Sequence, residues 1–503
     1  MTDSGRDSRR IPPISRWFIE PAATARIQPR FLNQPKYTGT VPNHPEQNPL
    51  NRPRATPFWV LTLLCGLAGV LPACTSFTAS EPPQPRVIRR PDLTPLPPPR
   101  AKGEPDMRVR LAARQTAATV AGPREVRVSP AGDAAQLRVL ATPVEFNLTV
   151  AAWNLRDARG QRTVIPRSGA KADDQLIVRP VAAAPLSLNG VTYAGEFRFM
   201  PRRFDESDSA ALPTFDVIEF VPLEQYLPGV VSKELIPSWS LEAFKAQTVA
   251  ARSYAIHERD RSIRDGATFD VEASEQDQAY AGATTNPTAI EAVKATRGQV
   301  LLFNGSVLRT YYSSCCGGRA GSARDTWPIQ KGFEFNLAEP IQGRDRPVPC
   351  PCNFSQRYRW TCTRPLPELV QRIRAYGRAE NLSVRDLGSL SRVVVTANND
   401  AGRPAAYRLF DNAGRWYPLS AEQLRLACNT PAQGLPPIDA KTRVFSGDLA
   451  FTFTDSTVRI DGRGFGHGVG MCQFGAEGHS RKGVPFAQIL QYYYPGATLG
   501  FAY

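Results

Sequence analysis

Residues 224–254 decide the fold and read EQYLPGVVSKELIPSWSLEAFKAQTVAARSY. The stretch Leu241–Asp260 contains no proline or glycine and is rich in strong helix formers. It opens after Ser240, a good N-cap residue, with Glu242 in its first turn. The sequence therefore predicts a long helix over 241–260. Glu234 stands between an apolar stretch and this helix, where we expect a loop that partly buries its carboxyl group.

The periodicity of the chain changes on the two sides of this point. Before it, residues 106–216 show short alternating runs separated by turn signals such as Asn189-Gly190, which is typical of strands. After it, strands and helices are mixed over residues 217–503. We expect helices at 287–296, 365–376 and 421–428, strands at 392–396 and 457–460, and a hairpin of 300–303 and 307–312 around Asn304-Gly305. The predicted class is α+β, with a mainly-strand N-terminal region followed by a mixed α+β domain.

The N-terminal part has the order of a secretory signal. Residues 1–57 form a polar, proline-rich leader that we expect to be untranslated in part, with a start near Val41. Residues 58–73 are mostly apolar and too short for a bilayer span of ~20 residues, so they predict a cleaved signal peptide, with an uncleaved anchor as the alternative. Leu71-Pro72-Ala73-Cys74 resembles a lipobox, which predicts lipidation of Cys74. Residues 74–105 form a proline-rich linker.

Length, charge and cysteine content narrow the class of protein. A chain of 503 residues with nine cysteines is no small disulfide scaffold. The net charge of +15 is spread without lysine runs or RNA-binding signatures, which favours anionic polymers in general, with nucleic acid as only one candidate; we expect a partner other than nucleic acid. Outside the cytoplasm, most cysteines after residue 74 are expected to form disulfides. Cys350, Cys352 and Cys362 are close enough in sequence to share a bonded cluster, whereas adjacent Cys315 and Cys316 are not expected to pair with each other.

A glycine-rich segment carries one of the four histidines. His467 lies in Gly462–Gly475, which has six glycines in fourteen residues and thus a backbone free to approach a ligand closely. The lysine of a phosphate-binding loop is missing from this segment. A purely structural glycine turn is the alternative. His257 lies on the long helix among charged residues, where a solvated or capping role is expected.

Four ordered blocks carry a family resemblance. They are residues 224–254; Asp270 with Gln278-Ala279-Tyr280 and Gly282; Tyr311–Gly318 leading to Trp327; and Gly464–Ala476. Together they resemble the stage II sporulation protein D / LytB amidase-enhancer family. The resemblance implies a lytic transglycosylase that cleaves the β-1,4 bond between N-acetylmuramic acid and N-acetylglucosamine in peptidoglycan and forms a 1,6-anhydromuramyl end. The alternative is a non-enzymatic, peptidoglycan-binding activator of a cell-wall amidase.

The resemblance also implies roles for individual residues. Glu234 matches the catalytic acid of the family, and one carboxyl group suffices because the sugar's own 6-hydroxyl attacks. Lys245 and Arg252 share a helix face and are expected to meet the muramyl carboxylate, unless they form a solvated basic stripe. Contacts to sugar hydroxyls are expected from Tyr280, Ser313, His467 and Gln473.

Some family members are said to carry a metal. Here Cys315, Cys316 and His467 are possible zinc ligands, with disulfide pairing as the preferred alternative and no other cofactor expected. The expected location is the cell envelope, outside the cytoplasm, as a membrane-anchored lipoprotein.

Overall fold

The computed structural model describes residues 103–122, 124–167, 174–181, 184–202 and 212–503, all within a compact unit that spans 87–503. The predicted leader, signal segment, Cys74 and nearly all of the linker lie outside the described residues. In the described part, no helix combines the length and the apolar character that a membrane crossing requires.

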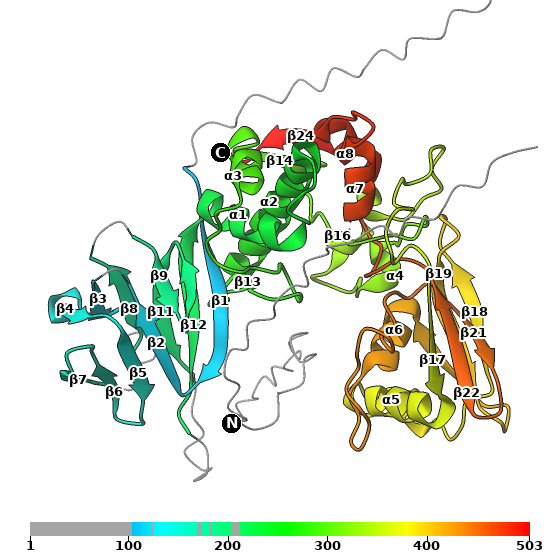
Figure 1. Ribbon diagram of the computed structural model, residues 1–503, viewed down its shortest axis with the longest axis horizontal. Helices are drawn as coiled ribbons and strands as arrows, with labels where there is room; N and C mark the ends of the chain where they lie inside the picture. Colours follow the sequence, from blue (N-terminus) through cyan, green and yellow to red (C-terminus); the bar gives the residue numbers. More distant parts are fainter. Residues whose placement is uncertain (1–102, 123, 168–173, 182–183, 203–211) are drawn as a thin grey trace, which may run out of the picture. The chain divides into compact units, whose positions relative to one another are not determined.

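The N-terminal region is built from two facing β-sheets (Figure 1). One sheet has the order β13-β1-β12-β11-β8-β3-β4 and the other β10-β9-β2-β5-β6-β7. Aromatic side chains from both sheets pack between them: the rings of Phe146 and Phe199 lie 4.6 Å apart, and those of Trp153 and Phe215 lie 5.0 Å apart. The elements are β1 (Asp106–Gln115), β2 (Ala117–Ala121), β3 (Glu125–Pro130), η1 (Ala134–Gln136), β4 (Arg138–Ala141), β5 (Val144–Leu148), β6 (Ala152–Arg156), β7 (Arg162–Pro166), β8 (Leu176–Pro180), β9 (Leu186–Leu188), β10 (Val191–Tyr193), β11 (Glu196–Pro201), β12 (Phe215–Pro222) and β13 (Val271–Glu272).

A helical part follows directly from β12. Most residues of its central helix α2 are buried, because α1, α3, α7 and α8 and strand β14 surround it. The elements are α1 (Leu223–Glu234), α2 (Leu241–Arg264), α3 (Pro287–Ala295), β14 (Gln299–Phe303), β15 (Ser306–Val307), β16 (Tyr312–Ser313), α4 (Ala323–Thr326), η2 (Glu334–Leu337), η3 (Glu339–Ile341), β23 (Met471–Cys472), α7 (Gln473–Ser480), α8 (Phe486–Tyr493) and β24 (Thr498–Phe501).

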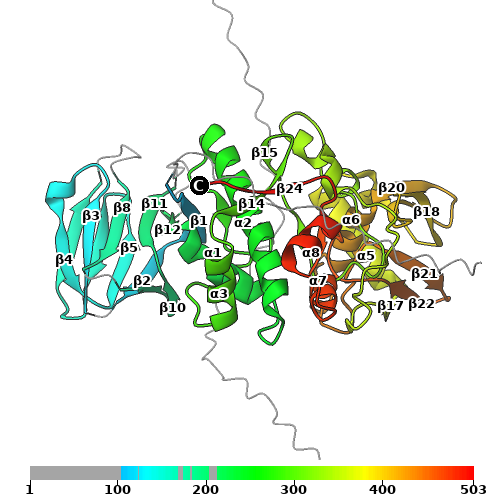
Figure 2. The same cartoon turned by 90° about the horizontal axis from the view of Figure 1, so that it is seen from above.

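Residues 360–462 form a smaller α+β unit inserted between β16 and β23, with a hydrophobic core of its own (yellow to orange in Figure 2). Two three-stranded sheets, β17-β22-β21 and β18-β19-β20, pack with two helices. The elements are β17 (Trp360–Pro365), α5 (Leu366–Ala379), η4 (Ser383–Asp386), β18 (Arg392–Asn398), β19 (Pro404–Phe410), β20 (Trp416–Ser420), α6 (Ala421–Asn429), β21 (Leu449–Phe453) and β22 (Thr457–Gly462).

The α+β class and the strand-rich start are confirmed, with three local corrections. The long helix begins at Leu241 as predicted, but Ser240 does not cap it with its side chain. Instead the Ser240 amide and hydroxyl both donate to the Glu477 carboxylate of α7, at 3.0 and 2.5 Å. The hairpin turns at Asn304-Gly305, both with positive φ, yet its second strand is only Ser306–Val307. Tyr312–Ser313 pairs instead with Met471–Cys472 as a parallel strand.

Candidate functional site

Glu234 is the last residue of helix α1, whereas the sequence predicted a loop there. Its two carboxylate oxygens are held from two other segments. The Ala279 backbone N–H donates to Oε1 at 3.3 Å, and the Gln473 side-chain amide at the start of α7 donates to Oε2 at 2.9 Å. Three segments that are distant in the sequence thus fix one acidic group.

The surroundings of Glu234 favour its protonated form. Burial raises the pKa of its carboxyl group above the ordinary value, against the opposing effect of the hydrogen bonds from Gln473 and Ala279. The nearby Glu275 carboxylate adds a smaller upward contribution. A carboxyl group with a raised pKa retains a transferable proton closer to neutral pH, as a general acid requires.

Close packing of α1 sets the position of Glu234. A Cβ atom at Gly229 would collide with the Gly282 carbonyl oxygen and the Tyr280 ring, so only glycine allows this approach. On the same helix, the Tyr226 hydroxyl donates to Gln278 Oε1 at 3.2 Å. The Leu-Pro-Gly-Val-Val stretch therefore seats α1 against the 278–282 segment that also supplies the Ala279 amide.

Tyr312 is a site residue that the sequence analysis missed. Burial, followed by the neighbouring Glu234 carboxylate, raises the pKa of Tyr312 well above its usual value, so the phenol stays protonated. Its hydroxyl accepts a hydrogen bond at 3.1 Å from Gln278, whose amide also donates to the Ala251 carbonyl oxygen. The block Tyr311–Gly318 contained the signal, but the choice between two adjacent tyrosines needs the strand register.

Ser313 lies beside Tyr312 on the two-residue strand β16, and neighbouring strand residues face opposite sides. Ser313 is buried next to Gly466, and its hydroxyl has no hydrogen-bond partner among the described residues. Its role as a sugar contact stays a prediction.

Tyr280 packs inside the protein, and its predicted contact with a sugar hydroxyl stays a prediction. It is 7% exposed, and its ring packs against those of Tyr226 and Tyr193 at 4.7 and 5.8 Å. Burial raises the pKa of its hydroxyl far above the ordinary value. The apolar, aromatic surroundings explain why it lies inside the protein.

His467 lies apart from the clustered cysteines, so it does not complete the predicted zinc set. Its Nδ1 accepts from the Val469 backbone N–H at 3.0 Å, and its ring packs against Trp327 at 4.8 Å. Burial lowers its pKa to about 4, so the imidazole is neutral at pH 7. His467 also lines a small cavity with Arg403 and Glu422, where a contact to substrate stays a prediction.

The two predicted basic contacts have structural partners. Arg252 is fully buried, and its guanidinium pairs with the Glu224 carboxylate through two hydrogen bonds of 2.8 and 2.9 Å. It also donates to the Gln299 carbonyl oxygen, so its guanidinium is held by protein partners, and its contact with the muramyl carboxylate stays a prediction. Lys245 is half-buried and pairs with Glu242 at 2.8 Å. Its contact with substrate stays a prediction.

The cysteines are arranged differently from the prediction. All seven cysteines of the described part are free, so the structure does not contain the predicted disulfides. Four of them come together: Cys316, Cys350, Cys352 and Cys472. Cys316 was a predicted metal ligand, whereas Cys315 lies outside this group of four. The other three ligand candidates were not recognised from the sequence, because they come from segments far apart.

Comparison with known proteins identifies the class. A family model described as SpoIID, stage II sporulation protein, matches residues 213–303, which carry α1, Glu234 and α2. Residues 213–303 therefore match the SpoIID family, and similarity to proteins that bear this family's names extends over more than half of the chain. It is 28% identical over 297 residues to the amidase enhancer of Bacillus subtilis, covering 54% of this chain and 40% of that protein.

Two further relatives are aligned with this chain over a larger share of their own length. Stage II sporulation protein D of Bacillus subtilis is 24% identical over 299 residues, covering 57% of this chain and 76% of that protein. An uncharacterised protein of Brachyspira hyodysenteriae is 29% identical over 316 residues, covering 62% of this chain and 73% of that protein. The match to the SpoIID family model favours a location in the cell envelope.

Proposed function

We propose that this protein is a peptidoglycan lytic transglycosylase with Glu234 as its single general acid and base. The observation that carries the proposal is the half-buried Glu234 carboxyl group, which has a raised pKa and is held by the Gln473 amide and the Ala279 N–H. Such an environment keeps a proton available and fixes its direction of transfer.

The reaction needs one proton donor and no external nucleophile. Protonated Glu234 gives its proton to the glycosidic oxygen as the bond to C1 of N-acetylmuramic acid breaks. The resulting carboxylate then takes the proton of that sugar's 6-hydroxyl, whose oxygen bonds to C1. The intramolecular attack gains effective molarity, and Glu234 returns to its starting state. The products are a free 4-hydroxyl on N-acetylglucosamine and a 1,6-anhydromuramyl end.

Mass spectrometry of products released from purified sacculi tests this proposal. The transglycosylase leaves 1,6-anhydromuramyl ends, and a hydrolase leaves reducing ends that are heavier by one water. A hydrolase of ordinary type would need a second carboxylate. The exposed Glu275 is the candidate for that role, since its charge reaches Glu234. If the products carried reducing ends, and if these ends were absent with Glu275→Gln, the protein would be a hydrolytic glycosidase and not a transglycosylase.

A non-enzymatic activator is the second candidate, and the relative named amidase enhancer favours it. In this case the Glu234 site binds glycan and a separate amidase does the cutting. Sacculi incubated with the pure protein then give no new glycan ends, while an added cell-wall amidase releases peptide faster in its presence.

Changing Gln473 to Leu should shift the pH dependence of glycan cleavage. The Gln473 amide donates to the Glu234 carboxylate and so lowers its pKa. Cleavage needs protonated Glu234, so the rate falls as pH rises through this pKa. Without the amide the pKa rises, and we expect the alkaline limb of kcat/KM to move to higher pH. Gln491→Leu, on the exposed face of α8, is the matched control and should leave the limb in place. If the alkaline limb of kcat/KM did not move in Gln473→Leu, the hydrogen bond from Gln473 would not influence the group that titrates.

Attachment to the membrane is part of the proposal. We expect a signal peptide ending before Cys74 and a lipid on Cys74, with residues 74–105 as the tether. Cys74→Ala should release the protein from the membrane fraction or stall its processing. Unchanged fractionation together with unchanged mature mass would instead indicate an uncleaved anchor.

A further inference from the structure

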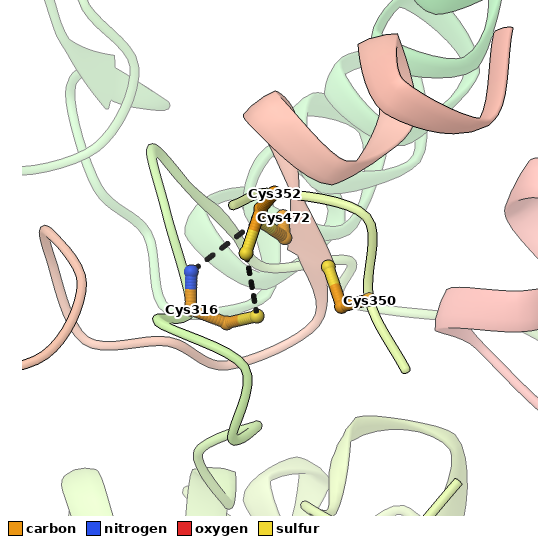
Figure 3. Close-up of side chains that lie close together, drawn as sticks. All are labelled: Cys316, Cys350, Cys352 and Cys472. Atoms are coloured by element: carbon orange, nitrogen blue, oxygen red, sulfur yellow. Dashed lines mark hydrogen bonds between the residues drawn. The ribbon is translucent and has the colours of Figure 1, made fainter. Parts of the chain in front are cut away.

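Four cysteine side chains from three separate segments meet inside the protein (Figure 3). Cys316 follows strand β16, Cys350 and Cys352 flank Pro351 in the loop before β17, and Cys472 ends strand β23. All four are buried, and their sulfur atoms lie within 4.8 Å of one another. The Cys352 N–H donates to the Cys350 carbonyl oxygen at 2.9 Å, which folds this short loop toward the other two cysteines.

We propose that these four thiolates bind one metal ion, and that the ion is zinc. Four sulfur ligands at tetrahedral spacing are characteristic of zinc or of a single iron. Zn–S bonds of about 2.3 Å require sulfur atoms about 3.8 Å apart in a regular tetrahedron. The sulfur atoms of Cys316 and Cys352 are 3.7 Å apart, so this edge already has the required length. Binding releases the thiol protons to solvent.

The surroundings suit a negatively charged cluster of sulfur atoms. The Cys316 and Gly475 backbone N–H groups both donate to the Cys472 sulfur at 3.3 Å. The Tyr493 hydroxyl lies 3.1 Å from the Cys350 sulfur and donates to it once the thiol has lost its proton. Such outer contacts orient metal ligands.

A half-buried cation, Arg346, also lies near the cluster. The Arg346 guanidinium lies over the rings of Tyr492 and Tyr493, 4.6 and 5.1 Å from their centres, and interacts electrostatically with Cys316 and Cys350. Zinc with four thiolates has a net charge of about −2, and this arginine offsets part of it.

Two glycines of α7 let the segments approach. A Cβ atom at Gly475 would collide with the Tyr493 hydroxyl and the Cys350 sulfur, and one at Gly478 with the Pro351 carbonyl oxygen. Cys472, Gly475 and Gly478 follow one another at intervals of three residues. The two glycines thus leave room for the Cys350-Pro351-Cys352 loop to lie against α7. The site ties the start of α7 to two other segments, one residue away from Gln473 and independently of any reaction at Glu234.

Metal analysis of the full-length protein, purified without chelators, tests the proposal. We expect about one zinc per chain, by elemental analysis, and replacement by cobalt should give the visible absorption of a tetrahedral cobalt thiolate site. Cys352→Ser and Cys472→Ser should each lose most of the metal. Cys362→Ser is the matched control, because this cysteine is equally buried but lies in the separate core of the inserted unit.

The unmodified protein provides a second measurement in case a variant fails to fold. Four thiols should be protected from a thiol reagent and become reactive when a chelator removes the metal. Stoichiometric iron in a coloured protein would support a metal site of four cysteines but overturn the assignment of zinc as its ion. Two disulfides among these cysteines, seen as a mass lower by two hydrogen atoms per bond, would overturn the proposal. Four reactive thiols that take up neither zinc nor cobalt under reducing conditions would overturn it as well.

Discussion

Glu234→Gln is expected to reduce the release of 1,6-anhydromuramyl products by at least about 10²-fold, the usual contribution of acid–base catalysis. Glutamine keeps the size of the side chain but has no proton to transfer. The Ala279 N–H still finds an oxygen, and the Gln473 amide accommodates the new amide by turning over to accept from it. Glycan binding, measured by cosedimentation with sacculi, should survive.

The same variant should be at least as stable as the parent protein at neutral pH. Burial raises the pKa of Glu234 in the folded state above its unfolded value. The folded state therefore binds more protons, and stability falls as pH rises through the window between the two values. The buried charge costs stability above this window, and the neutral amide removes that cost. Thermal unfolding of the parent protein and of Glu234→Gln at pH 7 and at pH 4 measures this effect. The gain in stability of the variant should vanish at the lower pH.

These two measurements together decide the role of Glu234. If Glu234→Gln formed product at the parental rate, Glu234 would not be the general acid and base. If neither protein gave products while both bound glycan and stimulated an amidase, the activator would replace the enzyme. A variant that lost both binding and stability would indicate a structural carboxyl group instead.

Arg252→Met is expected to destabilise the protein by about 3–5 kcal/mol, the typical effect of removing one partner of a buried ion pair. The Glu224 carboxylate would keep its burial, with a side chain only 9% exposed, and lose both charged hydrogen bonds. The methionine also leaves the Gln299 carbonyl oxygen without its donor.

Lys245→Met, on the same helix, is the matched control. Its ion pair with Glu242 is partly exposed, with side-chain exposures of 20% and 32%, so its loss should cost about 0–1 kcal/mol. Urea denaturation followed by circular dichroism measures both. Suppose that both variants lost little stability and that Arg252→Met bound glycan more weakly. This result would support the contact between Arg252 and the muramyl carboxylate that the sequence predicted.

Local signals in the sequence were sufficient for several elements. The helix over 241–264 has the right composition, and α3 begins at Pro287 behind Asn286, whose side chain caps it. Helix α6 begins after Ser420, which forms a capping box with Gln423. In each case the deciding residues lie within one turn of the element.

The remaining errors come from contacts between distant segments. The sequence predicted a loop at Glu234, yet helix α1 continues through Pro228 and Gly229 to Glu234 and packs against Gly282. The ion pair of Arg252 could not be predicted, because its partner Glu224 lies 28 positions away on another helix. The sequence likewise does not show that Cys316 and Cys472, 156 positions apart, are neighbours.

The hydrogen bond between Gln473 and Glu234 spans 239 positions of the chain. The loop that it closes contains the whole inserted unit of residues 360–462, so the acidic group acquires its partner only after nearly the entire polypeptide has been made. Contacts of such long range form late and slowly during folding. A chain cut before residue 473 would lack the Gln473 amide that donates to the Glu234 carboxylate, so the site cannot be complete without the C-terminal segment.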